Sequence, residues 1–186
     1  MKTLFLLLTF LMTSVIADEF NPPSDSSYVA WKTRKRMFLF KEVIPIGVSK
    51  NINIKKSVNN DFTIIIPKDS FDSGDSDRDK EVVLILKGKK NPNIEFNFNL
   101  SKLDIINLKS GDLKNIKGKL NATDSPIDVT FSISLNEDNK EAIDVKYEGN
   151  FSHFGIKPPK VAGGAVAKVY DELTLMGTIL FSDLMI

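Results

Sequence analysis

The segment Asp69–Asp79, with the sequence DSFDSGDSDRD, carries side chains that could bind a hard cation. EF-hand loops bind Ca²⁺ with a glycine at their sixth position and oxygen ligands at the third and fifth positions. With Gly74 at the sixth position, Phe71 falls at the third, where it can supply no side-chain oxygen. The register excludes an EF-hand. We interpret the segment as a solvated loop whose Asp or Ser side chains cap the turn that follows.

Other catalytic or metal-binding patterns are weak. His153 is the only histidine and the chain has no cysteine, which excludes multi-histidine zinc motifs and thiolate sites. His153 could act as a general base, but no G-x-S-x-G elbow supplies a serine nucleophile, so a structural or surface histidine is favoured. Gly163-Gly164-Ala165 lacks the spacing of a phosphate-binding loop and predicts a flexible connection. We therefore predict no enzymatic activity and no metal or cofactor.

The N-terminus predicts export. Residues 1–17 combine one lysine, an apolar run and a Val-Ile-Ala end, which is typical of a cleaved signal peptide; the alternative is a retained anchor. Residues 18–186 would form one domain, since 42% hydrophobic and 26% charged residues are ordinary for a globular chain. A formal charge of +1 gives no field that would attract nucleic acid, and the basic cluster Lys32–Arg36 is interpreted as a solvated face or loop.

Period-two alternation dominates the rest of the chain and predicts strands with one dry face. The apolar members alternate with polar ones in four segments, namely Ile94, Phe96, Phe98 and Leu100; Val129, Phe131, Ile133 and Leu135; Ile143, Val145 and Tyr147; and Leu173, Leu175, Ile179 and Phe181. Turn signals such as Lys87-Gly88 and Asn136–Asn139 separate the segments. This pattern indicates an antiparallel sheet, dry on one side and wet on the other.

About eight such strands must hide their dry face. Helical patterns are short and confined to Arg78–Leu86 and Val161–Glu172, so helices cannot cover the sheet and closure into a barrel is favoured. A barrel of about eight strands encloses space for its own side chains or for one small ligand. Periodicity alone leaves the filled and hollow alternatives open, with a filled core as the default.

Several motifs, taken together and in order, resemble the YceI-like family of exported proteins. They are Ser27–Trp31, Ser70–Asp75 with Arg78-Asp79, Gly118–Leu120, Ser125–Ile127 and Phe154–Pro159. Residues 32–50 depart from the family pattern, which indicates a divergent subgroup.

The resemblance implies a lipocalin-like antiparallel barrel in the periplasm, whose apolar lumen holds a polyisoprenoid or a fatty-acid derivative. Its partners would be this small amphiphile, a membrane in transient contact, and a second copy in a homodimer. If the apolar parity of each strand points inward, the lumen residues are Trp31, Phe62, Phe96, Phe98, Val129, Phe131, Ile133, Val145, Tyr147, Phe154, Ile179 and Phe181.

Two further expectations remain. The alternative function is a non-enzymatic stress-response or interaction module with a filled barrel, which would bind partners through residues 68–80 and 156–164. Asn150 lies in Glu148-Gly149-Asn150-Phe151-Ser152, a pattern similar to the acceptor of bacterial N-glycosylation.

Overall fold

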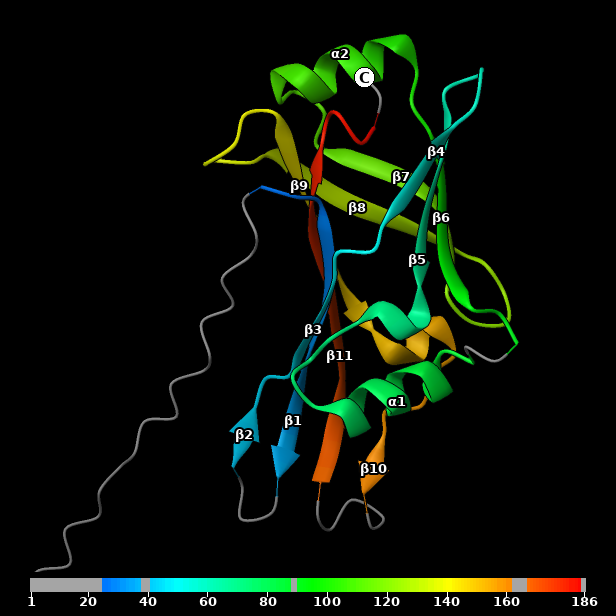
Figure 1. The fold of residues 1–186 in the computed structure, drawn as a ribbon, viewed down its shortest axis with the longest axis vertical. Coiled ribbons are helices and arrows are strands. Elements are labelled where there is room, and N and C mark those ends of the chain that lie inside the picture. Colours follow the sequence, from blue (N-terminus) through cyan, green and yellow to red (C-terminus); the bar gives the residue numbers. More distant parts are fainter. Residues whose placement is uncertain (1–24, 38–40, 88–89, 162–166, 185–186) are drawn as a thin grey trace, which may run out of the picture.

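The computed structural model describes residues 25–37, 41–87, 90–161 and 167–184 of the chain. Within these residues the chain forms one curled antiparallel sheet, two α-helices and two short 3-10 helices (Figure 1). The strands are β1 (Tyr28–Met37), β2 (Glu42–Val43), β3 (Ile46–Ser49), β4 (Asn53–Lys56), β5 (Asp61–Pro67), β6 (Asn93–Asn99), β7 (Asn115–Asn121), β8 (Ile127–Leu135), β9 (Ala142–Asn150), β10 (Lys160–Val161) and β11 (Ala167–Leu180). The helices are α1 (Ser76–Ile85), α2 (Lys102–Ser110), η2 (Lys68–Ser70) and η3 (Phe151–Phe154).

The strands pair in the order β2-β1-β11-β9-β8-β7-β6-β5-β4, while β3 also pairs with β1 and β10 with β11. Each pairing is antiparallel. The all-β prediction is confirmed. The predicted strands around Phe96, Val129 and Ile143 correspond to β6, β8 and β9.

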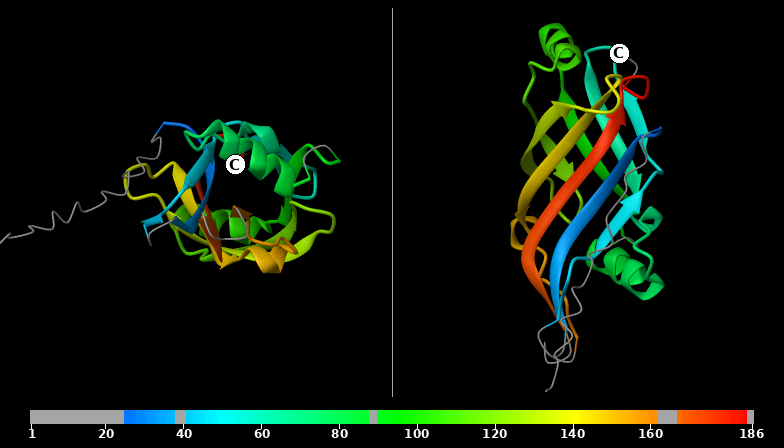
Figure 2. Two further views of the ribbon diagram at one scale, coloured as in Figure 1. Left: turned by 90° about the horizontal axis from the view of Figure 1, so that it is seen from below. Right: turned by 90° about the vertical axis from the view of Figure 1, so that its left-hand side faces the viewer.

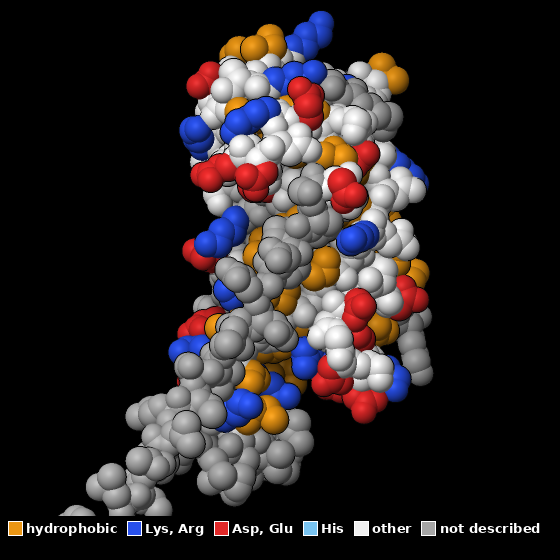
Figure 3. Space-filling model, turned by 60° about the vertical axis from the view of Figure 1, so that its left-hand side comes forward, with side chains coloured by type: hydrophobic (Ala, Val, Ile, Leu, Met, Phe, Trp, Pro, Cys, Tyr) orange, Lys and Arg blue, Asp and Glu red, His pale blue; other side chains and the backbone are white. Residues whose placement is uncertain are grey.

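Alternation produces the inner face of the sheet. In β6, Phe96 and Phe98 are buried while Asn97 and Asn99 are exposed. Directly opposed residues of paired strands point to the same face, so the Phe62–Phe98 and Phe96–Leu120 pairs extend the apolar face sideways. The polar members of the same strands face outward. On the face drawn in Figure 3, Lys and Arg are interspersed with Asp and Glu.

The curl closes without a hydrogen-bonded ladder between the edges of the described sheet. Instead the chain itself crosses from one edge to the other. Strand β3 pairs with β1, and after a connection of three residues the next strand, β4, pairs with β5. Next to this crossing, Val48 and Asp72 form an isolated bridge with two N–O distances of 2.9 Å. The hydroxyls of Ser49 and Ser70 lie 2.6 Å apart. Figure 2 shows the resulting ring of elements.

The helices differ from expectation in one place. The helical pattern of Arg78–Leu86 is confirmed as α1. The helix at Val161–Glu172 is wrong, because the described part of that segment belongs to β10 and β11, where Lys35–Val169 and Met37–Ala167 pairs place apolar residues on the inner face. The second helix is α2, where Ser101 and Asp104 form a capping box and Gly111 ends the helix with φ of 78°.

One end of the curled sheet is lined by deeply buried apolar side chains, and we call it the closed end. It lies next to α2 and the C-terminal turn in Figure 1. Its side chains are at most 5% exposed, and they are Phe62, Leu100, Leu108, Ile133, Phe181 and Leu184. The other end lies next to α1 and holds the cavity described below.

Candidate functional site

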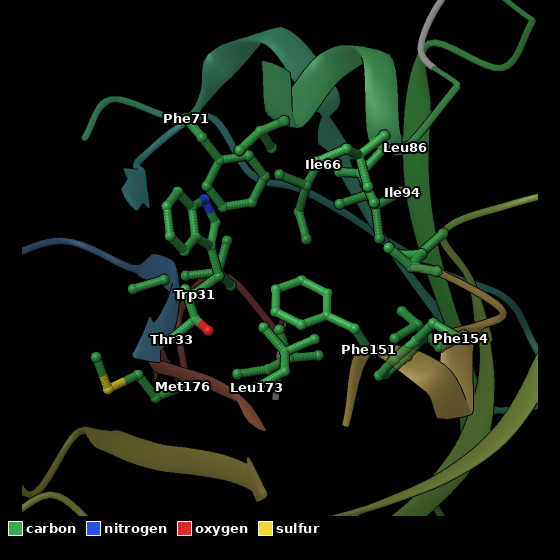
Figure 4. Close-up of a pocket in the computed structure, with 18 of the residues that line it drawn as sticks. Trp31, Thr33, Ile66, Phe71, Leu86, Ile94, Phe151, Phe154, Leu173 and Met176 are labelled. Atoms are coloured by element: carbon green, nitrogen blue, oxygen red, sulfur yellow. The ribbon is translucent and has the colours of Figure 1, made fainter. Parts of the chain in front are cut away.

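An apolar cavity of about 690 Å³ lies inside the curled sheet, within the range typical of ligand sites. Its wall is formed by β1, the strands β5 to β9, β11 and helix α1. Figure 4 shows aromatic and aliphatic side chains from these elements pointing toward a common space. Polar lining residues are few, and they are Thr33, Lys35, Asp75, Asp77, Arg78, Glu81 and Lys160. We call the end of the curled sheet that lies next to α1 and holds this cavity the cavity half.

A continuous row of rings crosses the inner face. Phe62 stacks on Phe98 at 5.2 Å between ring centroids, and Phe98 stacks on Phe96 at 5.0 Å. Phe131 follows at 5.0 Å from Phe96, and Tyr147 at 5.9 Å from Phe131. These separations are typical of favourable aromatic pairs, so the rings stabilise one another across β5, β6, β8 and β9.

Seven of the predicted lumen residues line the cavity: Trp31, Phe96, Phe98, Phe131, Val145, Phe154 and Ile179. Contact of these side chains with a lipid stays a prediction. The other five lie outside the cavity lining: Phe62, Val129, Ile133, Tyr147 and Phe181. Phe62, Ile133 and Phe181 pack in the closed end.

Tyr147 is directed along its strand instead of into the cavity. A Cβ at Gly149 would lie 2.3 Å from the Tyr147 hydroxyl, so the ring lies over this glycine. The hydroxyl is 2.5 Å from Nδ1 of His153, and burial raises the pKa of Tyr147 above its ordinary value. His153 is exposed, as the structural or surface interpretation expects.

Sequence reasoning missed the contribution of α1 to the wall. Val82, Ile85 and Leu86 line the cavity, as does Phe71 from the preceding loop. A signal was present, because residues spaced by three and four positions share one face of a helix. Strand parity gave no reason to place that face against the sheet.

Helix α1 is held at both ends by polar bonds. Asp75 Oδ1 accepts hydrogen bonds from the backbone N–H groups of Asp77 and Arg78, both at 3.1 Å, and these bonds hold the pKa of Asp75 below its ordinary value. At the other end the ammonium of Lys68, 1% exposed, donates to the carbonyl of Leu86 at 2.7 Å. Burial lowers the pKa of Lys68, while Asp124 opposes this shift. The Asp75 cap agrees with the interpretation of the acidic loop from sequence.

Two findings limit other kinds of site. The described residues hold no cluster of three or more His, Cys, Asp or Glu side chains that could bind a metal ion. In the same part of the chain, no helix is long and apolar enough to cross a membrane.

The chain is similar to a known protein family and to solved structures. A model of the YceI-like domain matches residues 26–181. The crystal structure of BcnA from Burkholderia cenocepacia is similar with a TM-score of 0.56 and 18% identity, over 81% of this chain and 94% of BcnA. A polyisoprenoid binding domain from Saccharophagus degradans, implicated in plant cell wall breakdown, gives a TM-score of 0.55 and 8% identity over 82% and 94% of the two chains. No curated protein matches significantly. At these identities the two structures show a shared fold.

Proposed function

Because the chain belongs to the YceI-like domain family, we propose that it is an exported, non-enzymatic carrier that holds a small amphiphile in its apolar cavity. A polyisoprenoid or a fatty-acid derivative is the proposed class of ligand. The observation that carries the proposal is the cavity of about 690 Å³ with its aromatic and aliphatic wall. Export to the periplasm is part of the proposal, and the signal-peptide pattern of residues 1–17, outside the described residues, supports it.

The physical basis is the transfer of an oily chain from water into this space. Each buried methylene contributes about 0.8 kcal/mol, so a chain of several carbons binds without any catalytic group or metal. The similarity in fold to a protein described as a polyisoprenoid binding domain supports the same class of ligand.

The alternative of an interaction module with a filled barrel has less support. At the closed end Leu108 and Leu184 are at most 2% exposed, but Leu184 also lines the cavity, so side chains do not fill the interior along its whole length. Membrane contact, a homodimer and glycosylation of Asn150 stay predictions from the sequence.

The test is to secrete the chain from a bacterial host, purify it under native conditions and identify extracted lipids by mass spectrometry. We expect an amphiphile at close to one molecule per chain. Val145→Phe, which fills space in the cavity wall, should reduce the lipid several-fold. Val58→Phe is the matched control, since Val58 is 100% exposed, and should leave the lipid content unchanged. A wild-type protein that is repeatedly empty would contradict the proposal.

A further inference from the structure

We propose that the polar group of the bound amphiphile is an uncharged hydrogen-bond acceptor, such as an ester or amide carbonyl, bound between Trp31 of β1 and Arg78 of α1. This inference rests on the proposed function, because it assigns one end of the ligand that the cavity would hold. It adds a chemical class for the head group and the residues that select it.

The first observation is a pair of donors without acceptors. Buried side-chain nitrogens that lack a hydrogen-bond partner in the described chain include Trp31 Nε1 and Arg78 Nε. Both residues line the cavity. Buried N–H groups in proteins are almost always paired, since leaving one unpaired loses its hydration without compensation. A ligand oxygen would supply the acceptor that the surrounding protein atoms do not.

The position of the indole restricts where this acceptor comes from. Trp31 is 9% exposed, and a Cβ at Gly47 would lie 2.4 Å from its Nε1 atom, so the ring lies against the Gly47 backbone. The Val48–Asp72 bridge brings the neighbouring Phe71 to the same wall, and Figure 4 shows both rings there. The N–H lies in the plane of the ring, so this contact with one face leaves it available to an acceptor in the cavity that Trp31 lines.

Arg78 of helix α1 is bonded to the loop that follows Phe71. Arg78 Nη1 donates to the carbonyl of Ser73 and Nη2 to Oδ2 of Asp75, both at 3.2 Å. Ser73 and Asp75 follow Phe71 in the loop that packs beside Trp31. The third nitrogen of the guanidinium, Nε, is buried and its N–H has no hydrogen-bond partner.

The inner face of β1 becomes more polar from Val29 toward Lys35. Val29, Trp31, Thr33 and Lys35 line the cavity in this order. The hydroxyl of Thr33 donates to the carbonyl of Glu172 at 2.7 Å, so its oxygen can still accept a hydrogen bond from an amide N–H of the ligand. The polar end of a ligand therefore fits beside Trp31 and Thr33, with its chain toward the closed end.

Charge decides between neutral and ionised head groups. The charged residues on the cavity wall balance, with Lys35, Arg78 and Lys160 against Asp75, Asp77 and Glu81. Arg78 is already paired with Asp75, and Lys35 acts on the same carboxylate. An ionised head of either sign would meet three side chains of its own charge and three of the opposite charge, so the wall offers no net attraction to offset the loss of its hydration. An uncharged acceptor loses far less hydration on entering the cavity.

The test compares three C12 probes at pH 8 that share one chain, namely methyl laurate, laurate and dodecylamine. Trp31 is the only tryptophan, so its fluorescence reports binding in the cavity directly. We expect methyl laurate to bind about tenfold more tightly than either ionised probe, the factor that one neutral hydrogen bond and an avoided charge penalty supply. Tighter binding of laurate or dodecylamine would overturn the proposal while leaving the carrier function intact.

Variants separate the donors from the shape of the wall, with displacement of N-phenyl-1-naphthylamine as the readout. Trp31→Phe removes the indole N–H and Arg78→Lys removes the Nε–H of the guanidinium while keeping the charge. Each should weaken methyl laurate about fivefold with little change for the naphthylamine probe. Phe71→Leu, the matched control without a polar atom, should weaken both ligands alike. Equal losses for both ligands in Trp31→Phe, or no loss in either donor variant, would overturn the proposal. If the wild-type protein binds no probe, the carrier function fails as well.

Discussion

The two ends of the curled sheet share strands but differ in what the adjacent helix contributes. At the closed end, α2 inserts Leu108, which is 1% exposed, among Leu100, Phe181 and Leu184. In the cavity half, α1 has no fully buried residue and presents half-buried Val82 and Ile85 as a wall. A helix that inserts a side chain fills the interior, whereas a helix that lies alongside leaves room for a ligand.

The largest expected effect is at the closed end. Phe62 is 0% exposed and stacks on Phe98, so Phe62→Ala leaves a void that packed neighbours cannot fill and should cost about 3–5 kcal/mol of unfolding free energy. Urea denaturation followed by circular dichroism measures this value. A cost below about 1 kcal/mol would show that the closed end is loosely packed.

The matched change in the cavity half is Phe131→Ala. Phe131 is half-buried and lines the cavity, so its removal enlarges a space that already exists and should cost about 1–2 kcal/mol. Lipid content should fall as the wall loses a ring. A cost equal to that of Phe62→Ala would remove the distinction between the two ends.

The helix caps give a finer comparison. Asp75 caps α1 and Ser101 caps α2, so Asp75→Ala and Ser101→Ala should each cost about 1 kcal/mol. Hydrogen exchange should increase in the helix that loses its cap. Only Asp75→Ala should also speed release of a bound lipid, because only α1 lines the cavity. Equal release rates in both variants would argue against α1 as a functional wall.

The smallest effect concerns Lys68, whose pKa burial lowers. Between this lowered pKa and the ordinary value of 10.5, the unfolded chain binds more protons, so stability rises with pH in this window. Lys68→Met removes the titrating group. The wild-type protein should therefore gain stability relative to Lys68→Met as the pH rises toward the ordinary value of 10.5. Urea denaturation at several pH values measures the difference, and a constant difference would contradict the shift.

Sequence predicted the sheet well because alternation is local. To predict the strands around Phe96, Val129 and Ile143 it was enough to know that side chains alternate along a strand and that one face of the sheet is dry. Sequence could not predict that Phe98 lines the cavity while Phe62 does not, because the alternation gives the face of the sheet that a residue lies on and not its position along the axis. That position depends on Leu108 and Leu184, which arrive from distant segments. The unpartnered N–H of Trp31 also depends on Gly47, Phe71 and α1, none of which strand periodicity relates to it.

The crossing from β3 to β4 has a consequence for the girth of the molecule. Residues 50–52 join β3, which pairs at one edge of the sheet, directly to β4, which pairs at the other edge. The length of this connection therefore limits how far the curled sheet can widen. Inserting glycine and serine residues there would loosen the fit and admit bulkier guests, and shortening it would exclude them.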